Sequence, residues 1–209
     1  MKITELTHPK DQIVNDYSLF ADHKEIPAVI KQNVLKALSY YPELKNTTIS
    51  FIFKPNIKSS VMQAQPVFKT LLLGRSARKY RINISEHFKL TNSTLPINKI
   101  PDDVMIGWIG HELGHIMDYE NRSNTGMMSF GYKYYFHSDY VKIAETVADT
   151  YAVNHGMGHY IISTKRFILD HADLPKSYKD KISKLYLSPD VIVEQVKKYE
   201  AQQLKKELR

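Results

Sequence analysis

The sequence predicts an α+β fold in which a small mixed β-sheet precedes a mostly helical half. Two segments in the first half, residues 47–53 and 80–85, are rich in the β-branched and aromatic residues that strands favour. After Pro101, apolar residues recur at helical spacing almost to the end of the chain. Strands that come before helices, instead of alternating with them, indicate an α+β architecture.

Length and composition indicate one globular domain. The chain has 209 residues, of which 43% are hydrophobic and 24% charged, the usual proportions for such a domain. We interpret residues 1–209 as a single domain, with 1–26 as an N-terminal arm and a cleft between two lobes near residues 110–120. Cysteine is absent, so any metal ligand must be His, Asp or Glu.

Targeting and membrane signals are not recognisable in the sequence. No stretch approaches the ~18 consecutive apolar residues that a membrane span requires. The first residues contain no apolar run of signal-peptide length. A cytoplasmic protein is therefore expected, and a chain trimmed of its leader would have the same sequence.

The chain carries a net charge of +7, which raises the question of an acidic partner. Its basic residues are spread along the sequence and form no arginine-rich arm or nucleic-acid motif, so nucleic acid is not expected as a partner. The exception is a basic window at residues 75–81. We favour a solvated strand flank there over a site for acidic substrate side chains. The window contains Arg75, Arg78, Lys79 and Arg81.

The first half predicts one helix and three strands. A helix is expected at 27–40, with Pro27 in its first turn. Strands are expected at 47–53, at 61–65 with a weaker signal, and at 80–85. The last alternates apolar and polar residues, which is typical of a strand with one buried face, and we expect it at a sheet edge. Its residues are Tyr80, Arg81, Ile82, Asn83, Ile84 and Ser85.

The second half predicts five helices and one long loop. The loop, residues 121–137, is rich in Met, Tyr and Phe. It could be a lid or a specificity wall over a cleft, or its apolar residues could simply pack into the core. The helices are expected at 102–119, from Ser138 to a glycine cap near Gly156, at 159–171, at 176–186, and from Ser188-Pro189 onward.

The motif His111-Glu112-Leu113-Gly114-His115 indicates a metal site. Residues four apart on a helix share one face, so both imidazoles can point at one ion. Neutral imidazole is a good zinc ligand. Glu112 lies about 100° further round the helix, where it can act on a water rather than bind the metal.

The same helix also carries packing signals. Three glycines in a helix cost about 1 kcal/mol each relative to alanine, so Gly107, Gly110 and Gly114 suggest close approach of a neighbouring element. The complementary small residues on the next long helix are Ala144, Ala148 and Ala152. Trp108 could form a wall beside the metal, although ordinary burial explains it better.

A third metal ligand is expected downstream, because catalytic zinc usually has three protein ligands and one open position. Glu145 is the best candidate. Asp149, one turn later on the same face, could accept a hydrogen bond from a ligand imidazole. The competing candidates for the third ligand are Asp118, His137 and His155.

The HELGH helix, followed thirty residues after His115 by Glu145-x-x-Ala148-Asp149, resembles the gluzincin clan of metallopeptidases, which includes thermolysin-like enzymes and minigluzincins. The resemblance covers about residues 80–156. It implies a zincin-like fold and one zinc ion per chain, held by His111, His115 and Glu145, with Asp149 supporting His111. The glycine and third ligand that metzincins place after the second histidine are Asp118 and Asn121 here, so that clan is disfavoured.

The function predicted from these motifs is peptide-bond hydrolysis by a metal-activated water, with Glu112 as the general base. An extended peptide or protein substrate is expected to pair with Tyr80, Arg81, Ile82, Asn83 and Ile84. The donor that stabilises the oxyanion is left open among six residues. These are Tyr135, His155, Tyr151, Tyr132, Tyr134 and His137.

The alternative function is a zinc-containing binding or regulatory protein without turnover, possibly associated with nucleic acid. A fourth protein ligand would favour this alternative, and an open coordination position would favour the enzyme. Either the N-terminal arm or the last helix could cover the cleft. The sequence does not indicate the substrate or the oligomeric state.

Overall fold

The computed structural model describes residues 17–55, 57, 60–170 and 174–207. Residues 1–16 of the predicted N-terminal arm lie outside this part. The rest of the arm forms a 3₁₀ turn at Tyr17–Phe20 and the two-residue strand β1 at Lys24–Glu25.

Four strands form a mixed sheet in the order β1-β2-β4-β3. β2 (Thr48–Lys54) runs parallel to β1 and to β4 (Lys79–Ser85), whereas β3 (Met62–Pro66) is antiparallel to β4 and forms one edge. All three predicted strands are therefore confirmed. A small hairpin, β5 (His87–Lys89) and β6 (Thr94–Pro96), was not predicted, because strands of three residues are too short to show a pattern.

The expectation that residues 80–85 form an edge strand is wrong. β4 is paired with β2 on one side and with β3 on the other. Asn83, expected on an open face, is buried and donates to Gln65 Oε1. Alternation in a sequence indicates which face of a strand is buried, but not which strands lie beside it.

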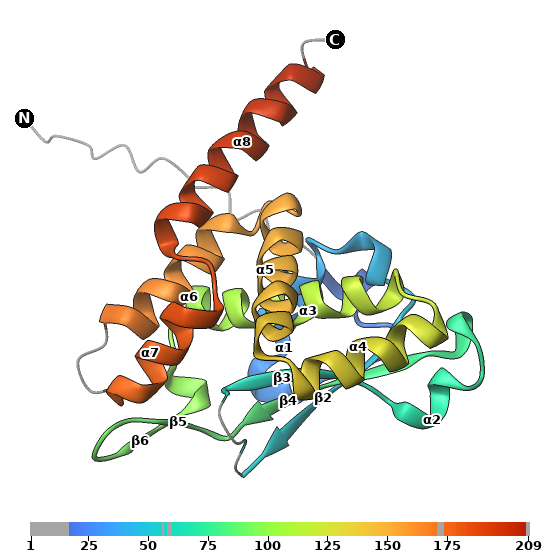
Figure 1. Ribbon diagram of the computed structural model, residues 1–209, viewed down its shortest axis with the longest axis horizontal. Coiled ribbons are helices and arrows are strands. Elements are labelled where there is room, and N and C mark those ends of the chain that lie inside the picture. The colour runs from blue at the N-terminus through green and yellow to red at the C-terminus, as the bar shows by residue number, and fades with distance from the viewer. Residues whose placement is uncertain (1–16, 56, 58–59, 171–173, 208–209) are drawn as a thin grey trace, which may run out of the picture.

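Helices make up the remainder of the fold (Figure 1). The helix expected at 27–40 begins as a 3₁₀ turn at Ala28–Ile30, and the other predicted helices are present. None of the described helices is both long enough and apolar enough to cross a membrane. The helices are α1 (Lys31–Leu38), α2 (Phe68–Leu71), α3 (Asp102–Glu120), α4 (Asn124–Phe136), α5 (Ser138–Asn154), α6 (Gly158–Asp170), α7 (Lys176–Leu185) and α8 (Pro189–Glu207).

The prediction of a loop at 121–137 is wrong, because most of this segment is α4. Ser123 caps the helix by accepting the Gly126 N–H at 3.0 Å, and Met127 and Phe130 pack into the core. Apolar and aromatic residues also occupy the exposed side, including Tyr132 and Tyr135. The helical period was therefore hidden, since large apolar and aromatic residues stand among the polar ones on the outer face.

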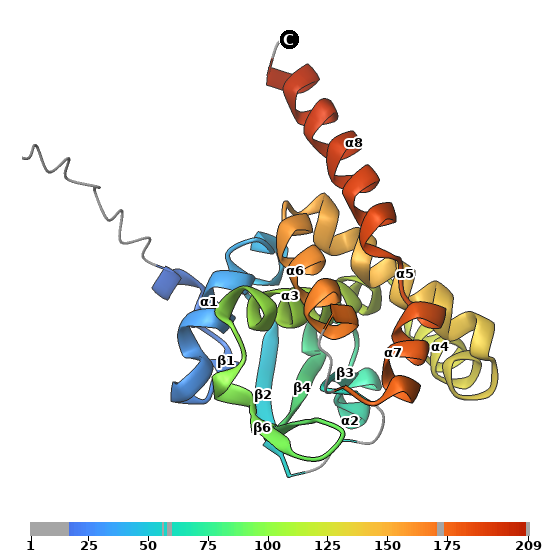
Figure 2. The ribbon, with the colours of Figure 1, turned by 90° about the vertical axis from the view of Figure 1, so that its left-hand side faces the viewer.

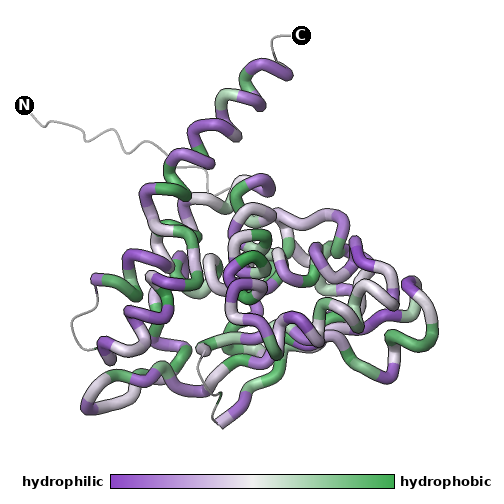
Figure 3. The backbone as a smooth tube through the Cα atoms, viewed as in Figure 1, coloured by the Kyte–Doolittle hydropathy of each residue, from purple (hydrophilic) through white to green (hydrophobic). Residues whose placement is uncertain are grey.

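α3 is the central element of the fold. It lies between the sheet and the pair of helices α5 and α6, while α8 packs on the far side of that pair (Figure 2). Every residue of α3 from 104 to 117 is buried, as expected for a helix enclosed on all sides. Hydrophobic segments gather around α3 and the sheet, and hydrophilic residues dominate the free end of α8 (Figure 3).

The glycines of α3 allow its neighbours to approach closely, as predicted. A Cβ on Gly107 would lie 2.2 Å from Thr164 Oγ1 of α6, and one on Gly110 would lie 2.4 Å from Met157 Cε. A Cβ on Gly114 would lie 2.4 Å from the carbonyl oxygen of Ala148 in α5. No side chain larger than hydrogen fits at these contacts without moving a neighbouring group.

We expect Gly114→Ala to destabilise the protein by about 1–3 kcal/mol, because the new methyl group would push α5 away from α3. Gly131→Ala is the matched control. Gly131 lies in α4 with no atom within 4 Å of an added Cβ, so alanine there should be neutral or stabilising by up to about 1 kcal/mol. Urea unfolding monitored by circular dichroism measures both changes. Equal effects of the two substitutions would contradict the close contact.

Candidate metal centre

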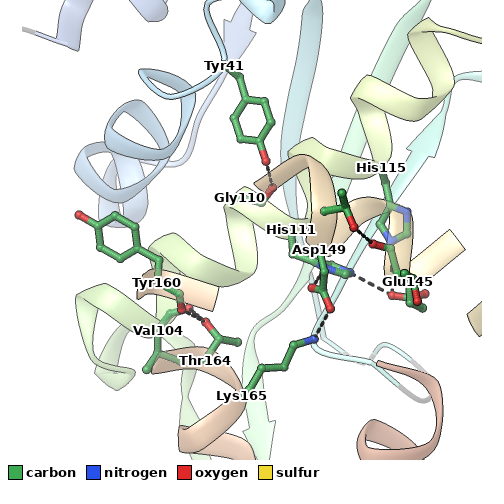
Figure 4. Close-up of polar contacts among 12 residues, drawn as sticks. Tyr41, Val104, Gly110, His111, His115, Glu145, Asp149, Tyr160, Thr164 and Lys165 are labelled. Carbon is green, nitrogen blue, oxygen red and sulfur yellow. Dashed lines mark hydrogen bonds and ion pairs between the residues drawn. The ribbon is translucent and has the colours of Figure 1, made fainter. Parts of the chain in front are cut away.

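α3 places His111 and His115 one turn apart on the same face. Their ring centroids are 4.8 Å apart, and each residue is only 6% exposed (Figure 4). Both rings are thus held away from bulk water with one nitrogen each directed toward α5.

α5 supplies the carboxylate that completes the cluster. Glu145 Oε2 lies 3.0 Å from His111 Nε2 and 3.4 Å from His115 Nε2. Glu145 precedes Ala148 by almost one turn, so the contact between Ala148 and Gly114 brings this carboxylate over the two rings. The structure therefore brings together the three residues predicted as ligands.

The spacing of the three donor atoms suits a metal ion. They all lie within 4.8 Å of one another. Ligand atoms about 2.0–2.1 Å from a tetrahedral zinc ion are separated from each other by about 3.3–3.4 Å, which is near the two observed separations of 3.0 and 3.4 Å between Glu145 and the histidines. The buried group His111, His115 and Glu145 could therefore hold a metal ion.

Asp149 supports the cluster as predicted. Its Oδ1 accepts a hydrogen bond from His111 Nδ1 at 2.9 Å. With the proton on Nδ1, the lone pair of Nε2 points toward Glu145, where a metal would lie. Sequence reasoning missed the partner of the other carboxylate oxygen: Lys165 Nζ of α6 donates to Asp149 Oδ2 at 2.8 Å.

Burial and charge act against each other in this cluster. Burial lowers the pKa of His111, but its hydrogen bonds to Asp149 and Glu145 outweigh burial and raise that pKa to about 10. Burial raises the pKa of Glu145, but His115 and His111 outweigh it and hold that pKa well below its ordinary value. Both pKa shifts show that positive charge beside the buried carboxylates is favourable in this cluster.

Glu112 is buried beside the cluster but does not belong to the group of possible ligands. Its Oε2 accepts the Ala64 N–H of the edge strand β3 at 2.6 Å. Burial raises the pKa of Glu112, against the opposing effect of the nearby histidines. A carboxylate with a raised pKa, fixed beside a metal centre, is suited to accept a proton.

With neutral histidines, the buried charges around the cluster sum to a net charge of −2. Among the described residues, the buried charged side chains here are the carboxylates of Glu112, Glu145 and Asp149 and the ammonium group of Lys165. When the histidines are neutral, as metal binding requires, and the carboxylates are ionised, three negative charges face one positive charge; without a metal, the raised pKa of His111 supplies a second positive charge. A divalent cation would balance them, and unpaired charge is costly in a buried site.

The competing candidates for the third ligand lie elsewhere. Asp118 forms an ion pair with Arg122 at 2.8 Å. His137 is exposed at the start of α5. His155 stacks on Tyr41 and lies 3.3 Å from Glu43. In the part of the chain that the structure describes, no other metal-ligating group joins the cluster.

Three of the six candidates for the oxyanion donor, Tyr135, Tyr151 and His155, do not reach the centre. Tyr135 is 84% exposed, and the Tyr151 hydroxyl accepts from Asn121 at 2.9 Å. His155 is occupied by the contacts described above. Tyr134, one of the other candidates, is the residue that reaches the cluster, because its hydroxyl donates to Glu145 Oε1 at 3.0 Å.

A cavity of about 550 Å³ opens beside the cluster, with Glu112, His115 and Glu145 in its wall. The whole of β3 lines one side of it, and residues of α4 line another. α7 contributes Lys181 and Leu185, and the following Tyr186 lies with its ring 5.4 Å from the ring of His111. The last helix, α8, packs on α5 and α6. Among the described residues after α6, the segment that borders the cavity is α7 with Tyr186.

Trp108 is buried and packs against Phe88 and Phe167, with ring centroids 5.4 and 6.1 Å away. Its principal role is therefore in the core, as expected.

The basic window at 75–81 has a structural role that the sequence did not indicate. Buried Arg78 donates to the carbonyl of Tyr119 at 2.9 Å and to Asn124 Oδ1 at 2.5 Å. Arg75 donates to the carbonyl of Glu120. Two cations thus bind carbonyls at the C-terminus of α3, where the helix dipole is negative. The expectation of a solvated strand flank is wrong for Arg78, which is buried, whereas Arg75 is exposed.

Comparisons with protein-family models, curated proteins and solved structures found no match for this chain. Its function is therefore inferred from the residues of the site.

We expect the purified protein to bind about one divalent metal ion per chain, and His115→Ala to abolish this binding. A metal held by three protein ligands loses most of its affinity when one ligand is removed. His159→Ala is the control, because His159 is an exposed histidine on α6. Elemental analysis of the three proteins measures the metal content. Equal metal content in His115→Ala and the wild type would contradict the site.

Proposed function

We propose that this protein is a zinc-dependent peptidase of the gluzincin type with a zincin-like fold. The observation that supports this most strongly is the convergence of His111, His115 and Glu145 in a buried cluster beside Glu112. The proposal combines this geometry with the resemblance of the H-E-x-x-H helix and the downstream Glu-x-x-Ala-Asp segment to gluzincins.

The donor set fits zinc. Two imidazoles and one carboxylate are a common set for catalytic zinc, with an open position for water or substrate. When bound, zinc would polarise the scissile carbonyl and lower the pKa of a water from 15.7 toward ~7. Nitrogen ligands also disfavour magnesium and calcium, which prefer oxygen.

Glu112 is the proposed general base. Its carboxylate accepts a proton from the attacking water and delivers it to the departing amine. The Ala64 N–H holds Oε2 at 2.6 Å, so the carboxylate has a fixed orientation and a second oxygen free of this bond. Burial, which raises its pKa, makes it a stronger base than an exposed glutamate.

Tyr134 is the proposed oxyanion donor. Its hydroxyl is within hydrogen-bond distance of Glu145 and lies in the wall of the cavity. A short rotation of the side chain would bring this donor from the carboxylate to the oxygen of a substrate carbonyl. Donors of this kind contribute about 10²–10³ in rate.

The edge strand β3, rather than β4, is the proposed docking strand for substrate. Val61 and Val67 form their hydrogen bonds with β4, so the alternation of an antiparallel ladder directs the backbone of Met62, Ala64 and Pro66 toward the other edge. Ala64 is already bonded to Glu112 and Tyr119, and proline has no N–H, so main-chain pairing there would use Met62 and the Pro66 carbonyl. All five residues of β3 line the cavity. An extended peptide could add to this edge by main-chain pairing.

The alternative of a zinc protein without turnover has less support. A closed structural site would need a fourth protein ligand. His137 and His155, the candidates for that ligand, are directed elsewhere. Among the described residues no fourth ligand joins the three, and this arrangement together with the adjoining cavity favours an enzyme.

We expect Glu112→Gln to lower the rate of peptide hydrolysis by about 10²–10⁴-fold while zinc remains bound, because the amide cannot accept the proton. Hydrolysis of fluorescein-labelled casein and zinc content are measured on the same sample. Glu194→Gln, on the exposed face of α8, is the control and should be fully active. Full activity of Glu112→Gln would exclude its role as the base.

Neighbouring tyrosines provide a matched pair for the oxyanion donor. Tyr134→Phe should lower kcat by about 10²-fold with little change in KM, since the lost hydrogen bond forms in the transition state. Tyr135→Phe should leave both constants unchanged, because that residue is 84% exposed. Steady-state kinetics on a quenched fluorescent peptide measure both. If Tyr134→Phe is fully active, the donor is another residue.

A further inference from the structure

We propose that Lys165 is a positioning residue of the metal centre. It binds one carboxylate oxygen of Asp149 and so orients the other oxygen toward His111. This inference rests on the proposed metal centre but not on peptide hydrolysis. Lys165 lies on α6, twenty residues beyond the last ligand, and belongs to none of the motifs that indicated the site.

The contacts form an unbranched chain from α6 to the cluster. Lys165 Nζ donates to Asp149 Oδ2 at 2.8 Å, and Asp149 Oδ1 accepts from His111 Nδ1 at 2.9 Å. His111 Nε2 in turn faces Glu145 at 3.0 Å. Each oxygen of Asp149 thus has its own partner, which fixes the rotation of the carboxylate (Figure 4).

The position of Lys165 follows from the packing of α6 against α3. Thr164, the preceding residue, donates to the carbonyl of Val104 at 3.0 Å and lies where a Cβ on Gly107 would be. This contact holds the α6 backbone against α3 immediately beside Lys165. The ammonium group also lies 4.1 Å from the centre of the Tyr186 ring.

The burial of both charges makes the pair energetically important. The side chain of Lys165 is 5% exposed and that of Asp149 is fully buried. Removing one partner from such a pair is strongly destabilising, because the remaining charge is left buried and uncompensated. An aspartate without Lys165 would have to take up a proton, move or admit water, and each of these changes weakens its hydrogen bond to His111.

Loss of this hydrogen bond should be measurable as a loss of metal affinity. Outer partners of metal-ligating histidines typically contribute 10–100-fold in affinity. Lys165 is itself a cation near the metal position, so simple charge repulsion predicts the opposite result. If charge repulsion were the only effect of Lys165, its removal would make the metal bind more tightly. The sign of the change therefore separates positioning from repulsion.

The experiment is a double-mutant cycle with zinc affinity as the readout. Zinc affinity is measured by competition with a chromophoric chelator for the wild type, Lys165→Met, Asp149→Asn and the double variant, and folding is checked by circular dichroism. Lys165→Met and Asp149→Asn should each bind zinc about 10–100-fold more weakly. The double variant should bind no more weakly than Asp149→Asn alone, because Lys165 acts through Asp149. Lys142→Met, which removes an exposed lysine of α5, should bind like the wild type.

Each outcome decides the proposal. A folded Lys165→Met protein with equal or tighter zinc binding overturns it, and so does a double variant whose losses simply add. If Lys165→Met does not fold, the double variant decides, because it removes both charges. A double variant that folds and binds zinc as tightly as Asp149→Asn supports the pairing. A double variant that does not fold, or that binds zinc more weakly, overturns it. A wild type that binds no zinc overturns this inference together with the metal centre. A protein that binds zinc but cleaves no peptide overturns only the proposed peptidase activity.

Discussion

The close approach of two helices to the glycines of α3 is the constraint on which the site depends. α5 contacts α3 at Gly114 and α6 contacts it at Gly107, each at a distance that leaves no space for a methyl group. Because Glu145 and Asp149 flank the first contact and Lys165 adjoins the second, the same packing sets the position of three charged side chains. Backbone packing and site geometry are therefore determined together.

Electrostatics explain why such a cluster can be buried. Three carboxylates and one ammonium group lie out of contact with water around two imidazoles. Hydrogen bonds satisfy the groups that are not directed at the metal position: Ala64 binds Glu112, Tyr134 binds Glu145, and Lys165 binds Asp149. With neutral histidines, the remaining excess of two negative charges is the electrostatic requirement that a divalent ion would meet. Three elements besides α3 and α5, namely β3, α4 and α6, supply these partners.

Local sequence patterns predicted the parts of the site that lie on single helices. The spacing of His111 and His115, the glycines of α3 and the pair Glu145 and Asp149 are all governed by helical periodicity. Lys165 could not be predicted in this way, because a lysine in an amphipathic helix is ordinary until its burial is known. The edge position of β3 and the capping of α3 by Arg75 and Arg78 also depend on contacts between segments far apart in the sequence. The helix α4 was missed because its exposed face is as aromatic as its buried one.

The central claim is that His111, His115 and Glu145 bind one zinc ion and leave a coordination position open. X-ray absorption spectroscopy of the zinc-loaded protein tests this claim most directly. We expect four nitrogen or oxygen neighbours, of which two show the outer-shell scattering of imidazole. In Glu145→Ala, we expect one neighbour that does not belong to an imidazole to be lost. A first shell with three or more imidazoles, or one that is unchanged in Glu145→Ala, would contradict the assignment.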